Sequence, residues 1–192
     1  METTVCLVRH GETEWNALGK LQGREDVDLT ARGAEQAVLT SKYLERRTSW
    51  DVIMSSPLTR AKKTAEIISD HLHTDPVIFL DDLIERDLGI ASGMSRAEIA
   101  ERFPDGEIPG QEPLAFVQTR MMKTLEYATQ RYSGQNIIMV SHGAAINALL
   151  SQLSDGKIGT GKMILQNACL NFVSNHDGKW SIEMYNFTNH LE

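Results

Sequence analysis

Hydrophobic residues follow two patterns along this chain. Short continuous apolar runs bounded by polar residues or glycine are typical of strands buried on both faces, and apolar residues spaced three or four apart are typical of helices. The runs predict strands near 5–8, 51–55, 76–80 and 136–141. The helical spacing predicts helices over 31–47, 57–72, 96–103, 114–132 and 144–153. Two final runs, 168–174 and 179–187, flank a polar turn that ends in glycine, and they predict a hairpin.

Capping residues indicate where several of these helices begin. Thr30 precedes the first helix and Ser95 precedes the short one, and both residue types are favoured as N-caps. Ser56 followed by Pro57 predicts a cap and a first helical position for the second helix. Between the elements we expect loops at 81–93, 104–113 and 154–166, and the first of these should return toward the strand ends.

Strands that alternate with helices, followed by a hairpin, predict an α/β fold with a mainly parallel sheet. The chain has 192 residues, enough for one well-buried core, so we expect a single domain over 1–192. Its hydrophobic share of 41% and charged share of 23% are those of a soluble globular protein. Cys6 and Cys169 each lie inside an apolar run and are expected to be small core residues.

The net charge of −7 narrows the expected partners. No long basic block is present, which argues against bulk electrostatic binding of nucleic acid or of an anionic membrane. The N-terminus enters the first strand directly, and no apolar run is long enough to span a bilayer. We therefore expect a cytoplasmic protein that binds neither nucleic acid nor membrane, and we leave a homodimer open.

Polar residues that suit anion chemistry follow three of the predicted strands. Arg9 and His10 follow the first strand, and His142 follows the strand at 136–141. Arg60 comes shortly after the strand at 51–55. Ligands of open α/β sheets bind outside the carboxyl ends of the strands. Two imidazoles and two guanidiniums at one rim would form an anion site in which one histidine could be a nucleophile.

Each of these residues also has a structural interpretation. The first strand could simply end in two polar residues, Arg60 could be a solvated helix residue, and Glu85 could be one of several loop acids. Taken singly, short motifs have high false-positive rates. The recurrence of His-Gly after two strands favours the functional interpretation.

The ordered motifs resemble the histidine phosphatase superfamily, in its phosphoglycerate-mutase-like branch. The resemblance covers the chain from its first strand to about Leu150. Within the family, the sequence is most similar to small broad-specificity bacterial phosphatases. The blocks that carry it are Leu7-Val8-Arg9-His10-Gly11-Glu12-Thr13-Glu14-Trp15-Asn16, Gln22-Gly23 with Asp28-Leu29-Thr30, Ser55-Ser56-Pro57-Leu58-Thr59-Arg60-Ala61, Glu85 with Gly89 and Gly93, and Ser141-His142-Gly143. The resemblance implies a three-layer fold with helices on both faces of the sheet.

The resemblance also implies roles for individual residues. His10 would be the nucleophile that forms a phosphohistidine, and Glu85 would be the general acid and later the base for water. The phosphoryl group would be bound by the remaining matched residues, which are Arg9, Arg60, His142, Asn16, Gln22, Gly23 and Gly143. With so many fixed cationic groups, neither a metal nor another cofactor is expected. The family's usual Gly-Glu-Ser appears here as Gly110-Gln111-Glu112-Pro113, which leaves Glu112 without an assigned substrate role.

The expected activity is hydrolysis of small phosphorylated metabolites, with inorganic phosphate as product. A cofactor-dependent phosphoglycerate mutase is the alternative. In mutases a longer and more basic insertion follows the position of Gly93, whereas here 94–113, where substrate selectivity should lie, is short and mostly acidic. A non-catalytic phosphate-binding module is the third hypothesis, and the presence of both His10 and Glu85 argues against it.

Overall fold

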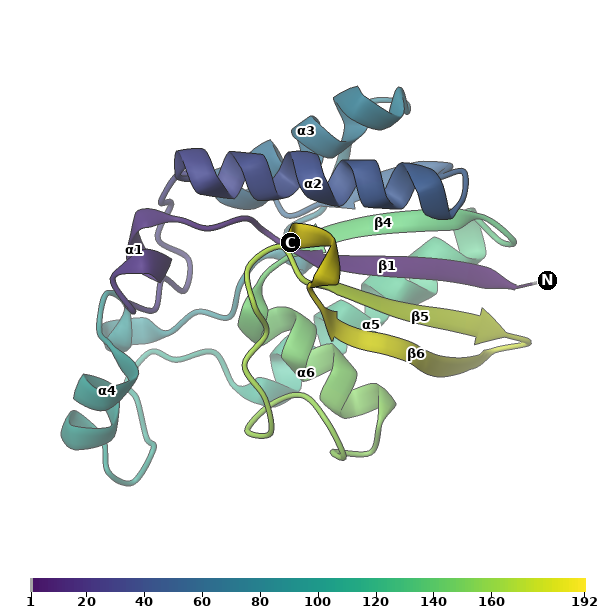
Figure 1. Cartoon of the computed structure of the whole chain (residues 1–192). Coiled ribbons are helices and arrows are strands. Elements are labelled where there is room, and N and C mark those ends of the chain that lie inside the picture. The colour runs from purple at the N-terminus through teal and green to yellow at the C-terminus, as the bar shows by residue number, and fades with distance from the viewer. Residues whose placement is uncertain (1) are drawn as a thin grey trace.

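The computed structural model describes residues 2–192 and contains one six-stranded sheet (Figure 1). The strand order is β3-β2-β4-β1-β5-β6. Four strands are parallel: β1 (Thr3–Arg9), β2 (Val52–Ser55), β3 (Ile78–Phe79) and β4 (Asn136–Ser141). The hairpin of β5 (Leu170–His176) and β6 (Lys179–Phe187) joins β1 in the antiparallel sense. The predicted α/β fold with a mainly parallel sheet and a C-terminal hairpin is confirmed.

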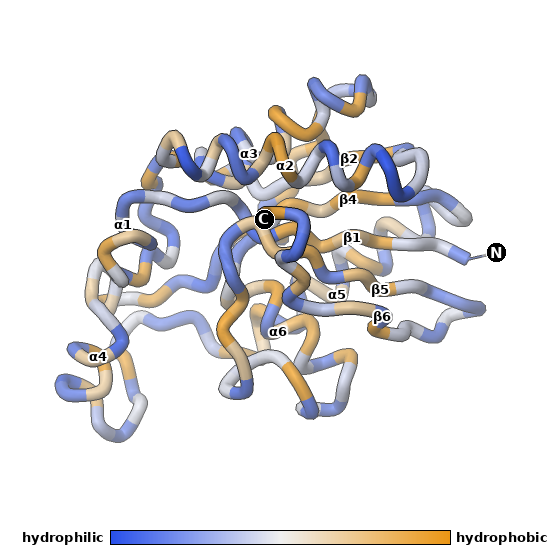
Figure 2. The backbone as a smooth tube through the Cα atoms, viewed as in Figure 1, coloured by the Kyte–Doolittle hydropathy of each residue, from blue (hydrophilic) through white to orange (hydrophobic). Residues whose placement is uncertain are grey.

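Helices cover both faces of the sheet and make three layers (Figure 1). The helices α2 (Ala31–Arg47) and α3 (Thr59–Leu72) pack on one face, and α5 (Leu114–Arg131) and α6 (Gly143–Leu153) pack on the other. Along β1, Val5 and Leu7 pack toward α5 and α6, whereas Cys6 and Val8 pack toward α2 and α3. Because both faces are buried, the central strands β1 and β4 are hydrophobic in their middle parts and polar at their ends (Figure 2).

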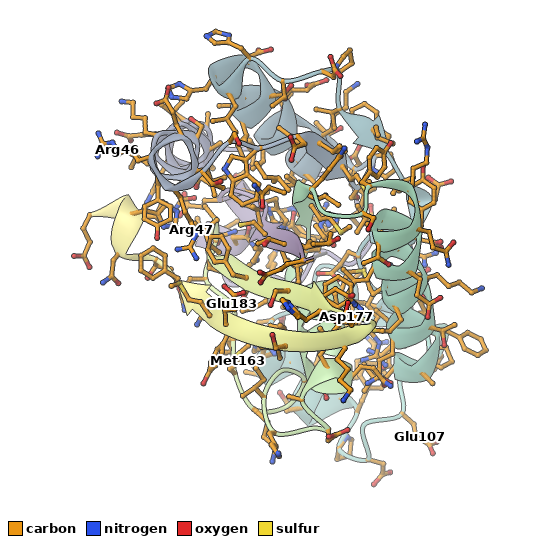
Figure 3. All side chains as sticks on the ribbon, turned by 90° about the vertical axis from the view of Figure 1, so that its right-hand side faces the viewer. Arg46, Arg47, Glu107, Met163, Asp177 and Glu183 are labelled. Atoms are coloured by element: carbon orange, nitrogen blue, oxygen red, sulfur yellow. The ribbon has the colours of Figure 1, made fainter. Side chains whose placement is uncertain are left out.

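The C-terminal end of α2 is fastened to the hairpin. The guanidinium carbon of Arg47 lies 4.0 Å from the centroid of the Phe172 ring on β5, and its Nη2 lies 4.0 Å from the Glu183 carboxylate on β6 (Figure 3). Pairs this exposed contribute at most about 1 kcal/mol. Most of the stabilisation at this edge therefore comes from the burial of Phe172, which is fully inaccessible.

Two short helices, α1 (Glu14–Ala17) and α4 (Arg96–Arg102), lie beyond the carboxyl ends of β1 and β4 (Figure 1). Ser95 caps α4 as predicted, and Glu98 completes a capping box. The loop at 81–93 contains the 3₁₀ turns η1 (Asp81–Leu83) and η2 (Gly89–Ala91), and a third turn, η3 (Asn189–Leu191), ends the chain. Among residues 2–192, no helix is both long and apolar enough to cross a membrane. Cys6 and Cys169 are buried and free, as expected of core residues.

The predicted start of α3 is wrong. The helix begins at Thr59, after Leu58 in an extended conformation, and Ser56 is not its cap. The Ser56 hydroxyl instead accepts the Leu58 amide proton at 3.3 Å and contacts His142. Asp26 takes the capping role from another loop, because its two oxygens lie 2.7 Å from the Thr59 amide nitrogen and 2.7 Å from the Thr59 hydroxyl.

The predicted start of β5 is also two residues early. Ala168 has a left-handed conformation with φ of 54°, so the chain bends there instead of joining the sheet. Pairing with β1 begins where Leu170 lies opposite Val8. The strand β3 is shorter than predicted, with two residues paired to β2.

Candidate active site

Three adjacent parallel strands deliver the candidate residues to one edge of the sheet. Arg9 ends β1 and His10 follows it, His142 is the N-cap of α6 directly after β4, and Arg60 lies in the first turn of α3 after β2. Because β2, β4 and β1 are neighbours, their carboxyl ends meet. The His10 and His142 ring centroids are 5.2 Å apart.

The hydrogen bonds of His10 define its protonation. Its Nδ1 lies 2.7 Å from the Gly11 carbonyl oxygen, which can only accept, so Nδ1 carries the proton. Its Nε2 accepts a hydrogen bond from Nε of Arg60 at 3.3 Å, since a guanidinium can only donate. The lone pair of Nε2 therefore faces the guanidinium, and the imidazole is neutral.

Burial and charge act in the same direction on this imidazole. His10 is 2% exposed, and burial lowers its pKa well below the usual 6.5, with further lowering by Arg60 and Arg9. His142 is fully buried, and its pKa is lowered by burial and then by Arg60 and the neighbouring groups. Both rings are therefore neutral near pH 7 and available as a nucleophile or a neutral hydrogen-bonding group.

The loop that carries His10 is held by close backbone contacts. The Gly11 amide donates to Oγ1 of Thr64 at 3.1 Å. A Cβ atom on Gly11 would lie 2.3 Å from the carbonyl oxygen of Gly33, and one on Gly33 would lie 2.1 Å from the carbonyl oxygen of Glu12. No side chain fits between these two segments, which explains why glycine follows the histidine and why a second glycine lies in the first turn of α2.

Arg60 is almost completely buried, at 1% exposed, and backbone carbonyls hold its guanidinium in place. Its Nη2 donates to the Gly23 carbonyl at 2.7 Å and its Nη1 donates to the Glu25 carbonyl at 2.6 Å. Burial lowers the pKa of Arg60 to about 10, while Glu85 and Asp26 act to raise it, so the group remains charged at neutral pH. Each terminal nitrogen keeps one further N–H for a ligand.

Arg9 is oriented by the loop that precedes the hairpin. Its Nη1 donates to the Leu165 carbonyl. A Cβ atom on Gly143 would contact its Nε at 3.4 Å, so the guanidinium lies directly against the start of α6. Burial lowers the pKa of Arg9, and the opposing charge of Glu85 acts to raise it.

His142 and Ser141 point to opposite sides of β4. The Ser141 hydroxyl donates to the Leu83 carbonyl at 2.7 Å, whereas Nε2 of His142 lies 2.7 Å from the Ser56 hydroxyl oxygen. Within residues 2–192, three polar atoms of the candidate residues are buried without a partner: Nε of Arg9, Oε1 of Gln22 and Nδ1 of His142. A buried polar atom without a partner costs about 1–3 kcal/mol, and of these three atoms Nε of Arg9 can donate to a bound anion, whereas Oε1 of Gln22 can only accept.

Asn16 is oriented by one residue close to it in sequence, Thr13, and by one far from it, Asn167. Its Oδ1 accepts hydrogen bonds from Thr13 and from Nδ2 of Asn167, the latter at 2.9 Å. Nδ2 of Asn167 also lies 3.3 Å from the carbonyl oxygens of His10 and Gly11. Sequence reasoning missed Asn167, because its partners His10 and Asn16 lie 157 and 151 positions away and no local pattern marks it. Since Oδ1 of Asn16 is occupied, its Nδ2 group is the part that can donate to a ligand.

The Glu85 carboxylate lies at the start of α6. Its Oε1 accepts the Ala145 amide proton at 2.9 Å and the Arg86 amide proton at 2.8 Å, and its Oε2 accepts the Ala144 amide proton at 3.1 Å. The carboxylate therefore occupies the positive end of the α6 dipole. It is the acidic residue of an otherwise basic surface.

The candidate residues line a cavity of about 440 Å³, except for His142, which is buried behind its wall. Among the described residues of its wall, five are basic and one, Glu85, is acidic; the basic ones are Arg9, Lys20, Arg60, Arg86 and Arg96. Asn16, Gln22, Gly23 and Gly143 also belong to the wall. Of the segment 94–113, the wall includes Arg96, Ile99, Ile108 and Gln111, and none of the acidic residues that make this segment acidic overall. The cavity is therefore suited to an anionic ligand with an apolar portion.

The described part of the chain, residues 2–192, contains no group of three or more His, Cys, Asp and Glu side chains arranged to hold a metal ion. The charges that could balance a phosphoryl group are instead the fixed guanidiniums. Arg60 lies within hydrogen-bond distance of the His10 nitrogen that carries the lone pair.

Comparison with known proteins identifies the family of this chain. The sequence model of the histidine phosphatase superfamily (branch 1) matches residues 5–188. A protein named uncharacterized phosphatase PhoE from Bacillus subtilis is 45% identical over 98% of this chain and 97% of its own. A metal-independent phosphoserine phosphatase from Arabidopsis thaliana is 34% identical, over 98% of this chain and 83% of its own.

A solved structure extends the likeness to the fold. The phosphoserine phosphatase from Entamoeba histolytica, in complex with 3-phosphoglyceric acid, superposes with a TM-score of 0.87 at 29% identity, covering 99% of this chain and 100% of that one. A mutant of the same enzyme was solved in complex with phosphoserine. A family match over nearly the whole chain and relatives named as phosphatases make this protein a phosphoric monoester hydrolase. The chain belongs to the histidine phosphatase superfamily, branch 1.

Proposed function

We propose that this protein hydrolyses small phosphomonoesters in two steps through a phosphohistidine on His10, without a metal ion. The observation that carries the proposal is the state of His10: Nδ1 donates to Gly11, and the lone pair of Nε2 faces Arg60 inside a basic cavity. A neutral imidazole nitrogen is a competent nucleophile near pH 7.

In the first step, Nε2 of His10 attacks phosphorus while the bond to the leaving oxygen breaks. Arg9 and Arg60 bind the phosphoryl oxygens, because guanidinium matches them in geometry and charge. Neutral donors complete the binding set, namely Asn16, Gln22, His142 and the backbone at Gly23 and Gly143. Glu85 gives its proton to the leaving oxygen, which departs as an alcohol.

In the second step, water attacks the phosphorus of phospho-His10 and passes a proton to the Glu85 carboxylate. The bond between nitrogen and phosphorus breaks, and inorganic phosphate and neutral His10 are regenerated. Fixed cationic groups stabilise the charge that develops on the equatorial oxygens in both steps, so no metal is needed for that purpose.

The proposed substrates are small phosphorylated metabolites. Two ligands bound by the structurally similar Entamoeba histolytica enzyme, phosphoserine and 3-phosphoglyceric acid, support this class. The five basic residues of the cavity wall are consistent with such anions, and the apolar Ile99 and Ile108 admit a carbon skeleton.

A mutase is the second candidate, because it needs the same nucleophile and acid. The 45% identical relative named as a phosphatase favours hydrolysis. Addition of bisphosphoglycerate to a phosphoglycerate assay separates the two functions: a mutase would then interconvert phosphoglycerates, whereas the proposed enzyme releases inorganic phosphate with or without bisphosphoglycerate and forms no isomeric phosphoglycerate.

The test of the nucleophile is covalent labelling. A radiolabelled phosphomonoester, mixed rapidly with enzyme and quenched, should give wild-type protein a label that is stable to base and labile to acid. His10→Ala should give none while remaining folded. His71→Ala, at a partly exposed site on α3, is the matched control and should label as wild type does. Equal labelling of His10→Ala and wild type would show that another residue is the nucleophile.

A further inference from the structure

Glu112 binds two arginines outside the cavity wall, just before α5. Its carboxylate is 12% exposed and accepts two hydrogen bonds from Arg120, at 3.0 Å from Nε to Oε1 and 3.1 Å from Nη2 to Oε2. Nη2 of Arg24 donates to Oε2 at 3.2 Å, and the Asp87 amide donates to the same oxygen at 3.3 Å. The residue thus joins α5, the loop after Gly23, and the loop that carries Glu85.

Both arginines also hold the backbone beside Glu85. Nη1 of Arg120 donates to the carbonyls of Asp82 at 2.8 Å and Ile84 at 2.6 Å. Nε of Arg24 donates to the Glu85 carbonyl at 3.3 Å. Each arginine is therefore a bridge with Glu112 at one end and the 82–85 backbone at the other.

The main chain of Glu112 makes a third set of contacts to the same loop. Its amide donates to the Asp87 carbonyl at 2.9 Å, and its carbonyl accepts from Nε of Arg86 at 2.7 Å. The loop that carries Glu85 and the segment before Glu112 also touch at Gly89. A Cβ atom on Gly89 would lie 2.1 Å from the carbonyl oxygen of Pro109. Gly89 also has a φ of 55°, which favours glycine.

The charge of Glu112 matters to this arrangement. Burial tends to raise its pKa, but the hydrogen bonds and charges of Arg120, the Asp87 amide and Arg24 outweigh burial and lower it. The carboxylate is therefore ionised at neutral pH. Without it, the guanidinium of Arg120, also 12% exposed, would lose its counter-charge and both bridges would lose an anchor.

We propose that Glu112 is a positioning residue, which holds the 82–87 loop through Arg120 and Arg24 and so keeps the Glu85 carboxyl against the reacting group. This inference rests on the proposed function, in which Glu85 is the general acid. It assigns to Glu112 an action through Glu85, distinct from contact with substrate and from general support of the fold.

The dependence of the rate loss on the leaving group distinguishes an action through Glu85 from general support of the fold. An alkyl phosphate leaves as a basic alkoxide and needs the proton of the acid, whereas p-nitrophenolate is stable as an anion and needs it little. General acid catalysis is typically worth ~10²–10⁴-fold, so Glu85→Gln should lose roughly that factor on an alkyl phosphate in single turnover and clearly less on p-nitrophenyl phosphate. Misplacement of a catalytic group by about 1 Å can cost ~10²-fold, so Glu112→Gln should lose about 10- to 100-fold on the alkyl ester and at most about threefold on the aryl ester.

The experiment compares wild type, Glu85→Gln, Glu112→Gln and the double variant in single turnover with both esters. Glu107→Gln, an exposed change in the same segment, is the matched control and should leave all rates unchanged (Figure 3). If Glu112 acts through Glu85, its substitution should add nothing in the Glu85→Gln background. Equal losses by Glu112→Gln on both esters, or an undiminished loss in that background, would overturn the proposal.

Hydrogen exchange separates this inference from the proposed function. Peptides that span 82–89 should exchange faster in Glu112→Gln, because glutamine has one neutral acceptor oxygen where the carboxylate has two for Arg120, Arg24 and the Asp87 amide. Unchanged exchange would refute positioning of the loop. If exchange rises but Glu85→Gln itself shows no preference between the esters, the acid assignment of Glu85 is wrong and Glu112 positions the loop for another purpose, which also overturns the inference as stated.

Discussion

The two neutral, buried histidines should make the stability of this protein fall in mild acid. Burial lowers the pKa of both His10 and His142 well below the 6.5 of a free imidazole. Below pH 6.5 the unfolded chain therefore binds protons that the folded chain does not, and the free energy of unfolding rises with pH. The stabilisation is complete above about pH 6.5 and is lost progressively as the pH falls toward the lowered pKa values.

The size of the effect follows from the burial of the two rings, which are 2% and 0% exposed. For a histidine that stays neutral when folded, moving from about pH 7.5 to about pH 5.5 changes the folding equilibrium by about tenfold, or about 1.4 kcal/mol. Both histidines together should cost roughly 3 kcal/mol, a large part of the ~5–15 kcal/mol that stabilises an ordinary domain.

Urea unfolding of wild type, His10→Asn and His142→Asn at the two pH values tests this reasoning. Other titrating groups contribute to the wild-type difference, but each substitution should reduce that difference by roughly 1 kcal/mol, with the denaturant slope unchanged. Ser56→Ala is the matched control, because it removes the partner of His142 without removing a titrating group, and it should keep the wild-type difference. If His10→Asn keeps the full difference, the pKa of His10 is not lowered by folding and its neutrality needs another explanation.

Two further predictions concern charge stabilisation and the start of α3. Activity should persist after exhaustive dialysis against EDTA and should be inhibited by vanadate, a mimic of the five-coordinate phosphoryl group; loss of activity that a divalent ion restores would contradict the metal-independent mechanism. Asp26→Ala should lower the free energy of unfolding by about 0.5–2 kcal/mol, because it removes the acceptor for the Thr59 amide. Asp26→Asn, which keeps an acceptor oxygen, should lower it less. Urea denaturation measures both changes, and equal stability of Asp26→Ala and wild type would contradict the capping role.

Local patterns in the sequence predict much of the fold. The helix expected at 31–47 is α2, because its apolar spacing and the Thr30 cap are both local signals. The helix α1 was missed, since four residues are too few to show periodicity. The start of α3 was misplaced because Ser56 bonds to His142, a residue 86 positions away, and because Asp26 replaces it as the cap.

In the candidate site, too, some features could be predicted from the sequence and others could not. Strand ends predict which side chains meet, because the carboxyl ends of parallel neighbours always share one edge of the sheet. The groups that orient those side chains could not be predicted, because their contacts are tertiary. Asn167 reaches His10 across 157 positions and Thr64 reaches Gly11 across 53, with no local pattern that marks either residue.

The charge of the site differs in sign from that of the whole chain. The net charge is −7, yet the described cavity wall has five basic residues and one acidic residue. Clefts with low-dielectric walls focus the field of their own charges, so an anionic substrate should respond to the cavity more than to the acidic outer surface. The hydrogen bonds of Arg60 preserve this field. Two backbone carbonyls, which are neutral acceptors, hold the guanidinium in place without neutralising it, so its charge is available to a phosphoryl group. Glu112 follows the complementary rule, because this carboxylate lies outside the cavity wall and forms its salt bridges with Arg24 and Arg120, which also lie outside the wall.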